Sequence, residues 1–163
     1  MTSSFFVFDL DDTLAYTTRD MLGDPKRVPH LTLLRGVRVL LKSLQGHTVL
    51  LTAGTEELQW EKIDHLKLRA LFTDIRVVAN RQEKEQALKE IIENTQVPRE
   101  RIVVVGDRID HEIRYANQLG CTTVRMRLRE GKYADKQPES GFDLPMYEVR
   151  DVAGLSEVVL RLF

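Results

Sequence analysis

Carboxylates follow two short apolar segments that lie far apart in this sequence. The segments are residues 5–8 and 102–105, and the carboxylates that follow them are Asp9, Asp11, Asp107 and Glu112. If both segments are strands of one sheet, these like charges would repel strongly unless a cation neutralised them. Oxygen ligands without paired histidine or cysteine favour a hard cation, and Mg²⁺ is the simplest candidate.

A carboxylate beside Mg²⁺ can hold the metal, or it can attack a phosphorus centre. A second carboxyl two residues further along, as Asp11 follows Asp9, could give and take the proton of a leaving group. The phosphoryl group being transferred is negative, so it also needs a hydroxyl and a cationic donor. Thr52 ends another apolar segment and Lys84 begins an amphipathic helix, so these two residues can supply the donors.

Apolar segments that alternate with helical patterns must position these residues. We expect strands at residues 4–8, 49–51, 75–79, 102–105, 122–126 and 147–149. We expect helices at residues 34–44, from Thr55 with an apolar stripe of Trp60, Ile63 and Leu66, at 82–95, through Ile113 to Leu119, and at 155–162. Residues 12–30 contain Gly23, Pro25 and Pro29 and are expected to be a loop. This alternation predicts an α/β fold, a three-layer Rossmann-like parallel sheet with helices on both faces, in which ligands bind at the carboxyl ends of the strands.

The composition predicts a single domain over residues 1–163. Hydrophobic residues make up 42% of the 163, which excludes a disordered chain. The longest apolar runs are far shorter than the ~20 residues of a membrane helix, and the first residues lack the basic segment of a signal peptide. The single cysteine, Cys121, is expected to be a small buried residue in a reducing compartment, which predicts a cytoplasmic location. The net charge of −1 identifies no partner.

Four motifs together resemble those of the haloacid dehalogenase-like superfamily, phosphatase branch. They are Asp9-Leu10-Asp11-Asp12-Thr13, the strand that ends at Thr52, Lys84 at the start of its helix, and Gly106-Asp107 with Glu112. The motifs occur in the family's order over roughly residues 5–127, with Glu112 where the family usually has aspartate.

The resemblance implies a role for each motif residue and a strand order of 5-4-1-2-3. Asp9 would be the nucleophile and a metal ligand, and Asp11 the general acid and base, with its backbone carbonyl on the metal. Thr52 and Lys84 would hold the phosphoryl oxygens, and Asp107 would ligate Mg²⁺. Glu112 would hold metal-bound water or orient Lys84. The substrate contacts we expect are Thr52, Ala53, Gly54, Lys84 and Arg108.

Members of this superfamily usually carry a cap domain over the site, and neither insertion position here has room for one. We therefore expect a core without a separate cap and an open site. An open site suits a bulky phosphorylated substrate, such as a phosphoprotein or a nucleic-acid end, or closure by a partner subunit in a homo-oligomer. A small phosphate ester stays open as an alternative if residues 15–30 or 129–145 fold over the rim.

Each singled-out residue also has a plainer interpretation. The aspartates and Thr52 could be helix caps, and Lys84 or Glu112 could belong to a solvated helix face. Arg108 could touch phosphate or form an outward ion pair. His111 is expected at the surface. Arg125, Arg127 and Arg129 alternate, so they could bind an anionic substrate or nucleic acid, although a solvated strand edge is favoured.

The function favoured by the sequence is a Mg²⁺-dependent phosphohydrolase that acts through an aspartyl-phosphate on Asp9. The alternative is a catalytically silent binding module of the same fold, which presents its open rim or the basic stripe from Arg125 to Lys132 to a partner. Transfer to an acceptor other than water is disfavoured, because without a cap nothing excludes water.

Overall fold

The computed structural model describes residues 3–163, which form a parallel sheet between two layers of helices. The strands are β1 (Phe5–Phe8), β2 (Thr48–Ala53), β3 (Asp74–Val78), β4 (Ile102–Gly106), β5 (Thr122–Met126) and β6 (Tyr147–Val149). Their order across the sheet is β3-β2-β1-β4-β5-β6, and every neighbouring pair is parallel. This confirms the expected order of the first five strands and adds β6 beside β5.

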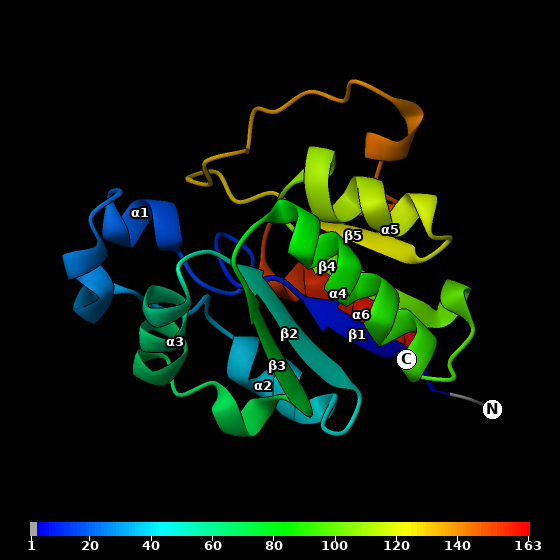
Figure 1. Ribbon diagram of the computed structural model, residues 1–163, viewed down its shortest axis with the longest axis horizontal. Helices are drawn as coiled ribbons and strands as arrows, with labels where there is room; N and C mark the ends of the chain where they lie inside the picture. The colour runs from blue at the N-terminus through cyan, green and yellow to red at the C-terminus, as the bar shows by residue number, and fades with distance from the viewer. Residues whose placement is uncertain (1–2) are drawn as a thin grey trace.

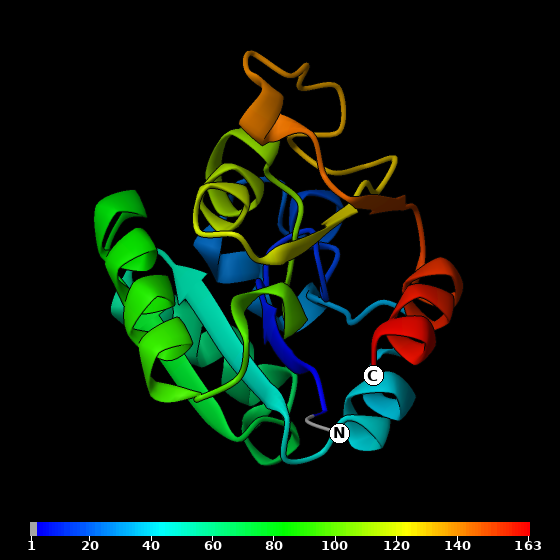
Figure 2. The ribbon, with the colours of Figure 1, turned by 90° about the vertical axis from the view of Figure 1, so that its right-hand side faces the viewer.

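The helices cover both faces of the sheet, as expected for a three-layer α/β fold. They are α1 (Thr17–Met21), α2 (Val37–Ser43), α3 (Glu56–His65), α4 (Arg81–Asn94), α5 (Arg114–Gln118) and α6 (Val152–Leu162). Shorter helical turns are η1 (Pro25–His30), η2 (Arg69–Leu71), η3 (Arg99–Arg101), η4 (Ile109–Ile113) and η5 (Gly141–Asp143). Figure 2 shows α4 and α5 on one side of the sheet and α2 and α6 on the other.

The alternation of side chains along β1 explains the two layers of core. Phe6 and Phe8 pack on the side of α2 and α6, whereas Val7 packs on the side of α4 and α5. All three side chains are buried, because a central parallel strand is covered on both faces. The continuous apolar sequence of this strand is therefore what the sheet requires.

Several expected boundaries differ from the structure; α6, for example, begins at Val152 and not at Leu155. Residues 12–30 are not all loop, because they contain α1 and η1. Pro25 stands at the first position of η1, where its missing N–H costs nothing, and the Asp24 carboxylate accepts a hydrogen bond from the Lys26 N–H. The second helix begins at Val37 and not at Leu34, because Gly36 adopts a left-handed conformation with φ +94°.

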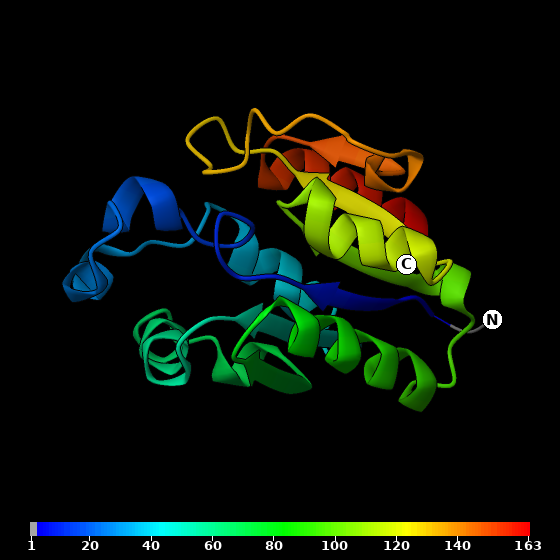
Figure 3. The ribbon, with the colours of Figure 1, turned by 45° about the horizontal axis from the view of Figure 1, so that its top comes forward.

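The strand register brings the two acidic motifs together. Phe8 on β1 is paired with Val105 on β4, so the residues after these strands leave the sheet side by side. Figures 1 and 3 show that α1 and α3 lie beyond the carboxyl ends of the strands. The segment of residues 127–146 also turns back at this end of the sheet. Within residues 3–163, no helix has the length and apolar character that crossing a membrane requires.

Candidate active site

Three buried carboxylates converge where β1 and β4 end. Oxygen atoms of Asp9, Asp107 and Glu112 all lie within 4.8 Å of one another. Gly106 allows this close approach, because a Cβ atom at this position would lie 3.1 Å from Cβ of Glu112. The π-helical turn η4 carries Glu112 back toward the end of β1.

Lys84, in the first turn of α4, is buried against this group. Its Nζ donates a hydrogen bond to Oδ1 of Asp9 at 2.7 Å and also contacts Oε1 of Glu112. The Asn80 side chain caps α4 by accepting a hydrogen bond from the Glu83 N–H, which fixes the start of the helix. The structure thus brings together the lysine and the carboxylates that the sequence singled out.

The electrostatics of the group show an excess of negative charge. Burial raises the pKa of Asp9 to about 7, and the charges of Glu112 and Asp11 add to this rise against the opposing charge of Lys84. Burial, together with the charges of Glu112 and Asp9, also holds the pKa of Asp107 well above its usual range. For Glu112 burial acts in the same direction, but the neighbouring Lys84 ammonium and the His111 hydrogen bond outweigh it and lower its pKa.

The donor set fits a small hard cation. It consists of carboxylate oxygens, and Oε2 of Glu112 is buried without a hydrogen-bond partner in the described part of the chain. A divalent cation among these oxygens would lower the raised pKa values of Asp9 and Asp107, because it favours their ionised forms. The residues present therefore fit Mg²⁺, which prefers oxygen ligands.

Asp11 lies at the same end of the sheet and is held from two sides. Its Oδ1 accepts hydrogen bonds from Nζ of Lys62 at 2.9 Å and from Oγ1 of Thr17 at 2.7 Å. Its Oδ2 accepts a hydrogen bond from Nε2 of Gln59 at 3.0 Å. Gln59 and Lys62 lie on α3, and sequence reasoning missed both.

A signal for these two residues was present in the helical pattern. The buried stripe of α3 and the turn after it is Gln59, Lys62, Ile63 and Leu66. This is the i, i+3, i+4, i+7 spacing of a buried face, and the expected stripe had placed Trp60 there instead. Trp60 is half-buried, with the Arg69 guanidinium 4.4 Å above its ring. Polar residues at buried positions of an amphipathic helix are therefore the pattern that points to Gln59 and Lys62.

A cavity of about 270 Å³ connects these groups. Among the residues in its wall are Asp9, Asp11, Ala53, Lys62, Lys84, Asp107, Arg108, Glu112, Lys132 and Tyr133. Thr52 and Gly54 are not in this wall. Thr52 is fully buried, and its Oγ1 accepts a hydrogen bond from Nε2 of Gln59 at 2.6 Å.

Asp12 and Arg108 connect the cavity to neighbouring loops. The Asp12 carboxylate accepts hydrogen bonds from the backbone N–H groups of Thr18 and Lys132. Arg108 stacks on the Tyr133 ring at 4.1 Å and pairs with Asp110 at 3.3 Å, so it both lines the cavity and forms an ion pair.

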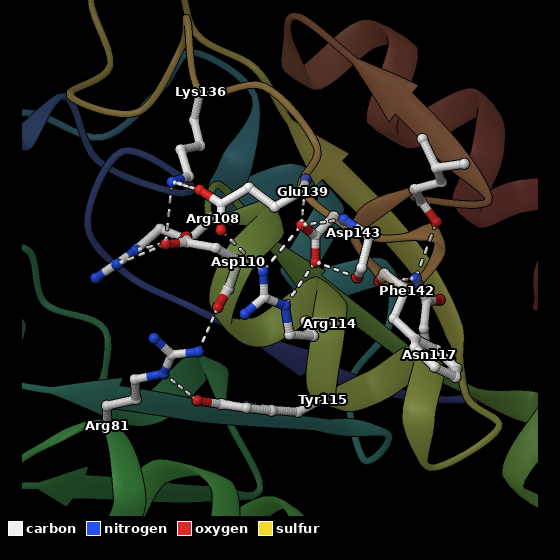
Figure 4. Close-up of polar contacts among 12 residues, drawn as sticks. Arg81, Arg108, Asp110, Arg114, Tyr115, Asn117, Lys136, Glu139, Phe142 and Asp143 are labelled. Carbon is white, nitrogen blue, oxygen red and sulfur yellow. Dashed lines mark hydrogen bonds and ion pairs between the residues drawn. The ribbon is translucent and has the colours of Figure 1, made fainter.

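The segment over residues 127–146 is fastened to η4 and α5 by a polar network (Figure 4). Arg114 and Asp143 form a two-point ion pair at 2.6 and 2.9 Å, with the Asp143 side chain fully buried. Lys136 reaches Asp110 at 3.9 Å, and the Asn117 amide donates to the carbonyl of Phe142 at 2.7 Å. This network holds Lys132 and Tyr133 at the cavity, so the segment contributes to its wall.

Two expectations about this region are wrong. Arg129 and Lys132 of the basic stripe are exposed, but Arg125 is buried and donates to the Tyr133 carbonyl and Arg127 donates to the Ala134 carbonyl, so the stripe is not a solvated edge at these two arginines. These arginines therefore support the segment instead of facing a partner. His111 is not at the surface either, because η4 buries its ring edge-on against Tyr115.

The carboxylate group and the buried lysine lie at the carboxyl ends of a parallel sheet of order 3-2-1-4-5-6, which makes this an α/β protein with a candidate active site at this edge. The sequence model of the haloacid dehalogenase-like hydrolases matches residues 23–126, which include Thr52, Lys84, Asp107 and Glu112. The chain belongs to this family.

Similar proteins are known by sequence and by structure. The chain is 35% identical over 114 residues to the glyceraldehyde 3-phosphate phosphatase of Methanopyrus kandleri, covering 68% of this chain and 48% of that protein. It is 28% identical over 127 residues to the protein of the same name from Methanocaldococcus jannaschii, covering 75% and 53%. The chain thus spans about half the length of these curated relatives.

Solved structures with the same fold share little sequence with this chain. The HAD-hydrolase YfnB from Bacillus subtilis, bound to magnesium, is 16% identical with a TM-score of 0.71, covering 98% of this chain and 99% of that one. A protein from Clostridium acetobutylicum described as a predicted phosphatase is 16% identical with a TM-score of 0.77, covering 98% and 100%. At this identity the likeness concerns the fold alone.

Proposed function

We propose that this chain is a Mg²⁺-dependent phosphomonoester hydrolase that forms an aspartyl-phosphate on Asp9. The observation that carries the proposal is the buried contact of Asp9 with Lys84 at 2.7 Å, beside two further carboxylates, in the wall of a cavity. The phosphatase names of the relatives from Methanopyrus kandleri and Methanocaldococcus jannaschii support the same reaction.

Asp9, Asp107 and Glu112 would hold the cation, with the backbone carbonyl of Asp11 as a further ligand. When bound, Mg²⁺ supplies positive charge that offsets the negative charge of the carboxylates and of the phosphoryl group. We propose that Glu112 both orients Lys84 and binds the cation, because its Oε1 contacts Lys84 while its Oε2 is left for the cation.

The chain's own residues then carry out two successive displacements at phosphorus, the first by Asp9 and the second by water. The Asp9 carboxylate attacks phosphorus, the ester P–O bond breaks, and Asp11 gives its proton to the departing oxygen. Asp11 next takes a proton from water as that water attacks the acyl phosphate, which releases phosphate and restores Asp9. Lys84 holds Asp9 in orientation and offsets charge on the phosphoryl oxygens. Thr52 is fully buried outside the cavity wall, so its contribution is the hydrogen bond that its oxygen accepts from Gln59.

We propose a small phosphate ester as the substrate and a core without a separate cap domain. Thr17 and Thr18 from residues 15–30, and Lys132 and Tyr133 from residues 129–145, line the cavity, so both segments fold over the rim. This arrangement favours the small-ester alternative over a bulky substrate. The binding-module alternative loses Arg125 and Arg127 as part of a binding surface, since they bind the neighbouring segment.

The test is hydrolysis of p-nitrophenyl phosphate and a panel of alkyl phosphates by the purified chain with Mg²⁺. We expect turnover that EDTA abolishes and that falls to background in Asp9→Asn, whereas the matched control Asp135→Asn, at an exposed position, keeps it. Calorimetric titration of Mg²⁺ supplies a readout besides activity. Turnover that survives Asp9→Asn or EDTA would refute the proposal, and Mg²⁺ binding without any turnover would favour the binding module.

A further inference from the structure

The Asp11 carboxylate is held by three side chains from two different helices. Thr17 reaches it from α1, and Gln59 and Lys62 reach it from α3, at 2.7, 3.0 and 2.9 Å. Figure 1 shows both helices beyond the carboxyl ends of the strands. The Asp11 side chain is nonetheless 31% exposed, so it stays accessible from the cavity.

The burial of Lys62 shows that this arrangement has a cost. Its side chain is only 6% exposed, and in residues 3–163 its one ion-pair partner is Asp11. Burying an ammonium group is unfavourable unless it is paired, and replacing such a pair with apolar groups is often neutral or stabilising. Stability of the fold alone therefore does not account for a buried lysine at this position of α3.

The hydrogen bonds leave one oxygen of Asp11 available. Each oxygen of a carboxyl group has about two directions for hydrogen bonding, as an acceptor or, when protonated, as a donor. Lys62 and Thr17 occupy Oδ1, whereas Oδ2 accepts only from Gln59. The remaining hydrogen-bonding position is therefore on Oδ2. Its direction is fixed because donors to both oxygens hold the orientation of the carboxyl group.

Gln59 also connects Asp11 to the end of β2. The two N–H groups of its amide reach Asp11 and Thr52. Gly54 makes room for this side chain, since it has φ +155° and a Cβ atom there would lie 3.1 Å from Cδ of Gln59. The general acid and the expected phosphoryl-binding hydroxyl are thus fixed by the same side chain.

We infer that Gln59 and Lys62 are positioning residues that aim Oδ2 of Asp11 at the leaving oxygen of the phosphate ester. This inference rests on the proposed function. As the Asp9 oxygen bonds to phosphorus and the ester P–O bond breaks, the proton on Oδ2 passes to the alkoxide oxygen and a neutral alcohol leaves. An aryl phosphate with a stable phenolate leaving group gains little from this proton, so a positioned acid matters for alkyl esters.

The experiment compares kcat/KM for glycerol 3-phosphate and p-nitrophenyl phosphate with Mg²⁺. In Lys62→Met we expect kcat/KM for the alkyl ester to fall by about 10- to 100-fold, part of the contribution of general acid catalysis. The value for the aryl ester should change by less than about 3-fold, because its leaving group needs no proton. Lys62→Arg should recover part of the alkyl activity, and Lys42→Met, on the exposed side of α2, should change neither value.

A double-mutant cycle separates positioning from structural damage. Asp11→Asn alone should show the same selective loss, and adding Lys62→Met should cause little further loss, because both changes remove one function. Gln59→Leu gives a second, independent variant if Lys62→Met does not fold. Equal losses for both substrates, or faster alkyl hydrolysis in Lys62→Met, would overturn this inference alone. If the wild-type chain hydrolyses neither ester, the proposed function itself is wrong.

Discussion

Asp9 should make the metal-free protein less stable as the pH rises. Its pKa is raised from 3.8 to about 7 in the folded chain, mainly by burial. The folded state therefore favours the protonated carboxyl, and the associated stability is fully present below pH 3.8 and lost as the pH passes through about 7. The full difference corresponds to at most about 4 kcal/mol. For a chain of this length that is a fall in melting temperature of roughly 8–16 °C.

The assay is thermal unfolding in EDTA from pH 4 to pH 8, for the wild type and for Asp9→Asn. The variant cannot ionise at this position, so its melting temperature should exceed that of the wild type at pH 8, with the difference disappearing toward pH 4. The comparison cancels the effect of carboxylates remote from Asp9, whereas Asp107, whose raised pKa depends partly on the Asp9 charge, changes the difference in the same direction. Asp135→Asn should follow the wild type at every pH.

Mg²⁺ should reverse the effect of pH, because it binds the ionised carboxylates. Its addition should raise the melting temperature of the wild type more at pH 8 than at pH 5, and should do little in Asp9→Asn. The reasoning fails if wild type and variant keep a constant difference in melting temperature across the pH range in EDTA. It also fails if Mg²⁺ stabilises both proteins equally.

Three further changes test the polar interior. Lys84→Met leaves Asp9 and a second carboxylate buried without their lysine, so the free energy of unfolding in urea at pH 8 should fall by about 3–5 kcal/mol. The exposed control Lys89→Met should change it by less than about 0.5 kcal/mol. Asp143→Asn removes the charge that pairs with Arg114, and should lower the stability of the segment and admit proteases to residues 129–145; unchanged cleavage would contradict this. Burial raises the pKa of Cys121 to about 11, so iodoacetamide at pH 8 should alkylate it only in urea, and rapid labelling of the native protein would be the contrary result.

The sheet could be predicted because buried parallel strands leave a simple pattern in the sequence. A continuous apolar run such as residues 102–105 fits a strand covered on both faces, and the polar residue after it marks the carboxyl end. Residues 12–30 gave no such pattern, since α1 and η1 are too short to show periodicity. These short helices are held in place by tertiary hydrogen bonds. The Asp12 carboxylate accepts one from Thr18, and Thr17 donates one to Asp11.

The residues of the candidate site could be predicted where they come directly after a strand or in the first turn of a helix. Asp9, Asp107 and Lys84 are of this kind, and the structure brings them together. Gln59 and Lys62 are not, because a polar residue on a helix is normally solvated, and only their place in the buried stripe distinguishes them. Their partner Asp11, in the loop after β1, comes close only after folding.

The turn η4 shows why a helical pattern alone could not place His111 and Glu112. The Ile113 N–H donates to the Arg108 carbonyl five residues earlier, so this turn contains one more residue than an α-helical turn. Both side chains are buried, His111 against Tyr115 and Glu112 against Lys84. The wider turn brings Glu112 to Lys84, and Gly106 leaves space for it. The departure of Glu112 from the usual aspartate is therefore accommodated by the local backbone, which keeps a carboxylate at this place despite the longer side chain.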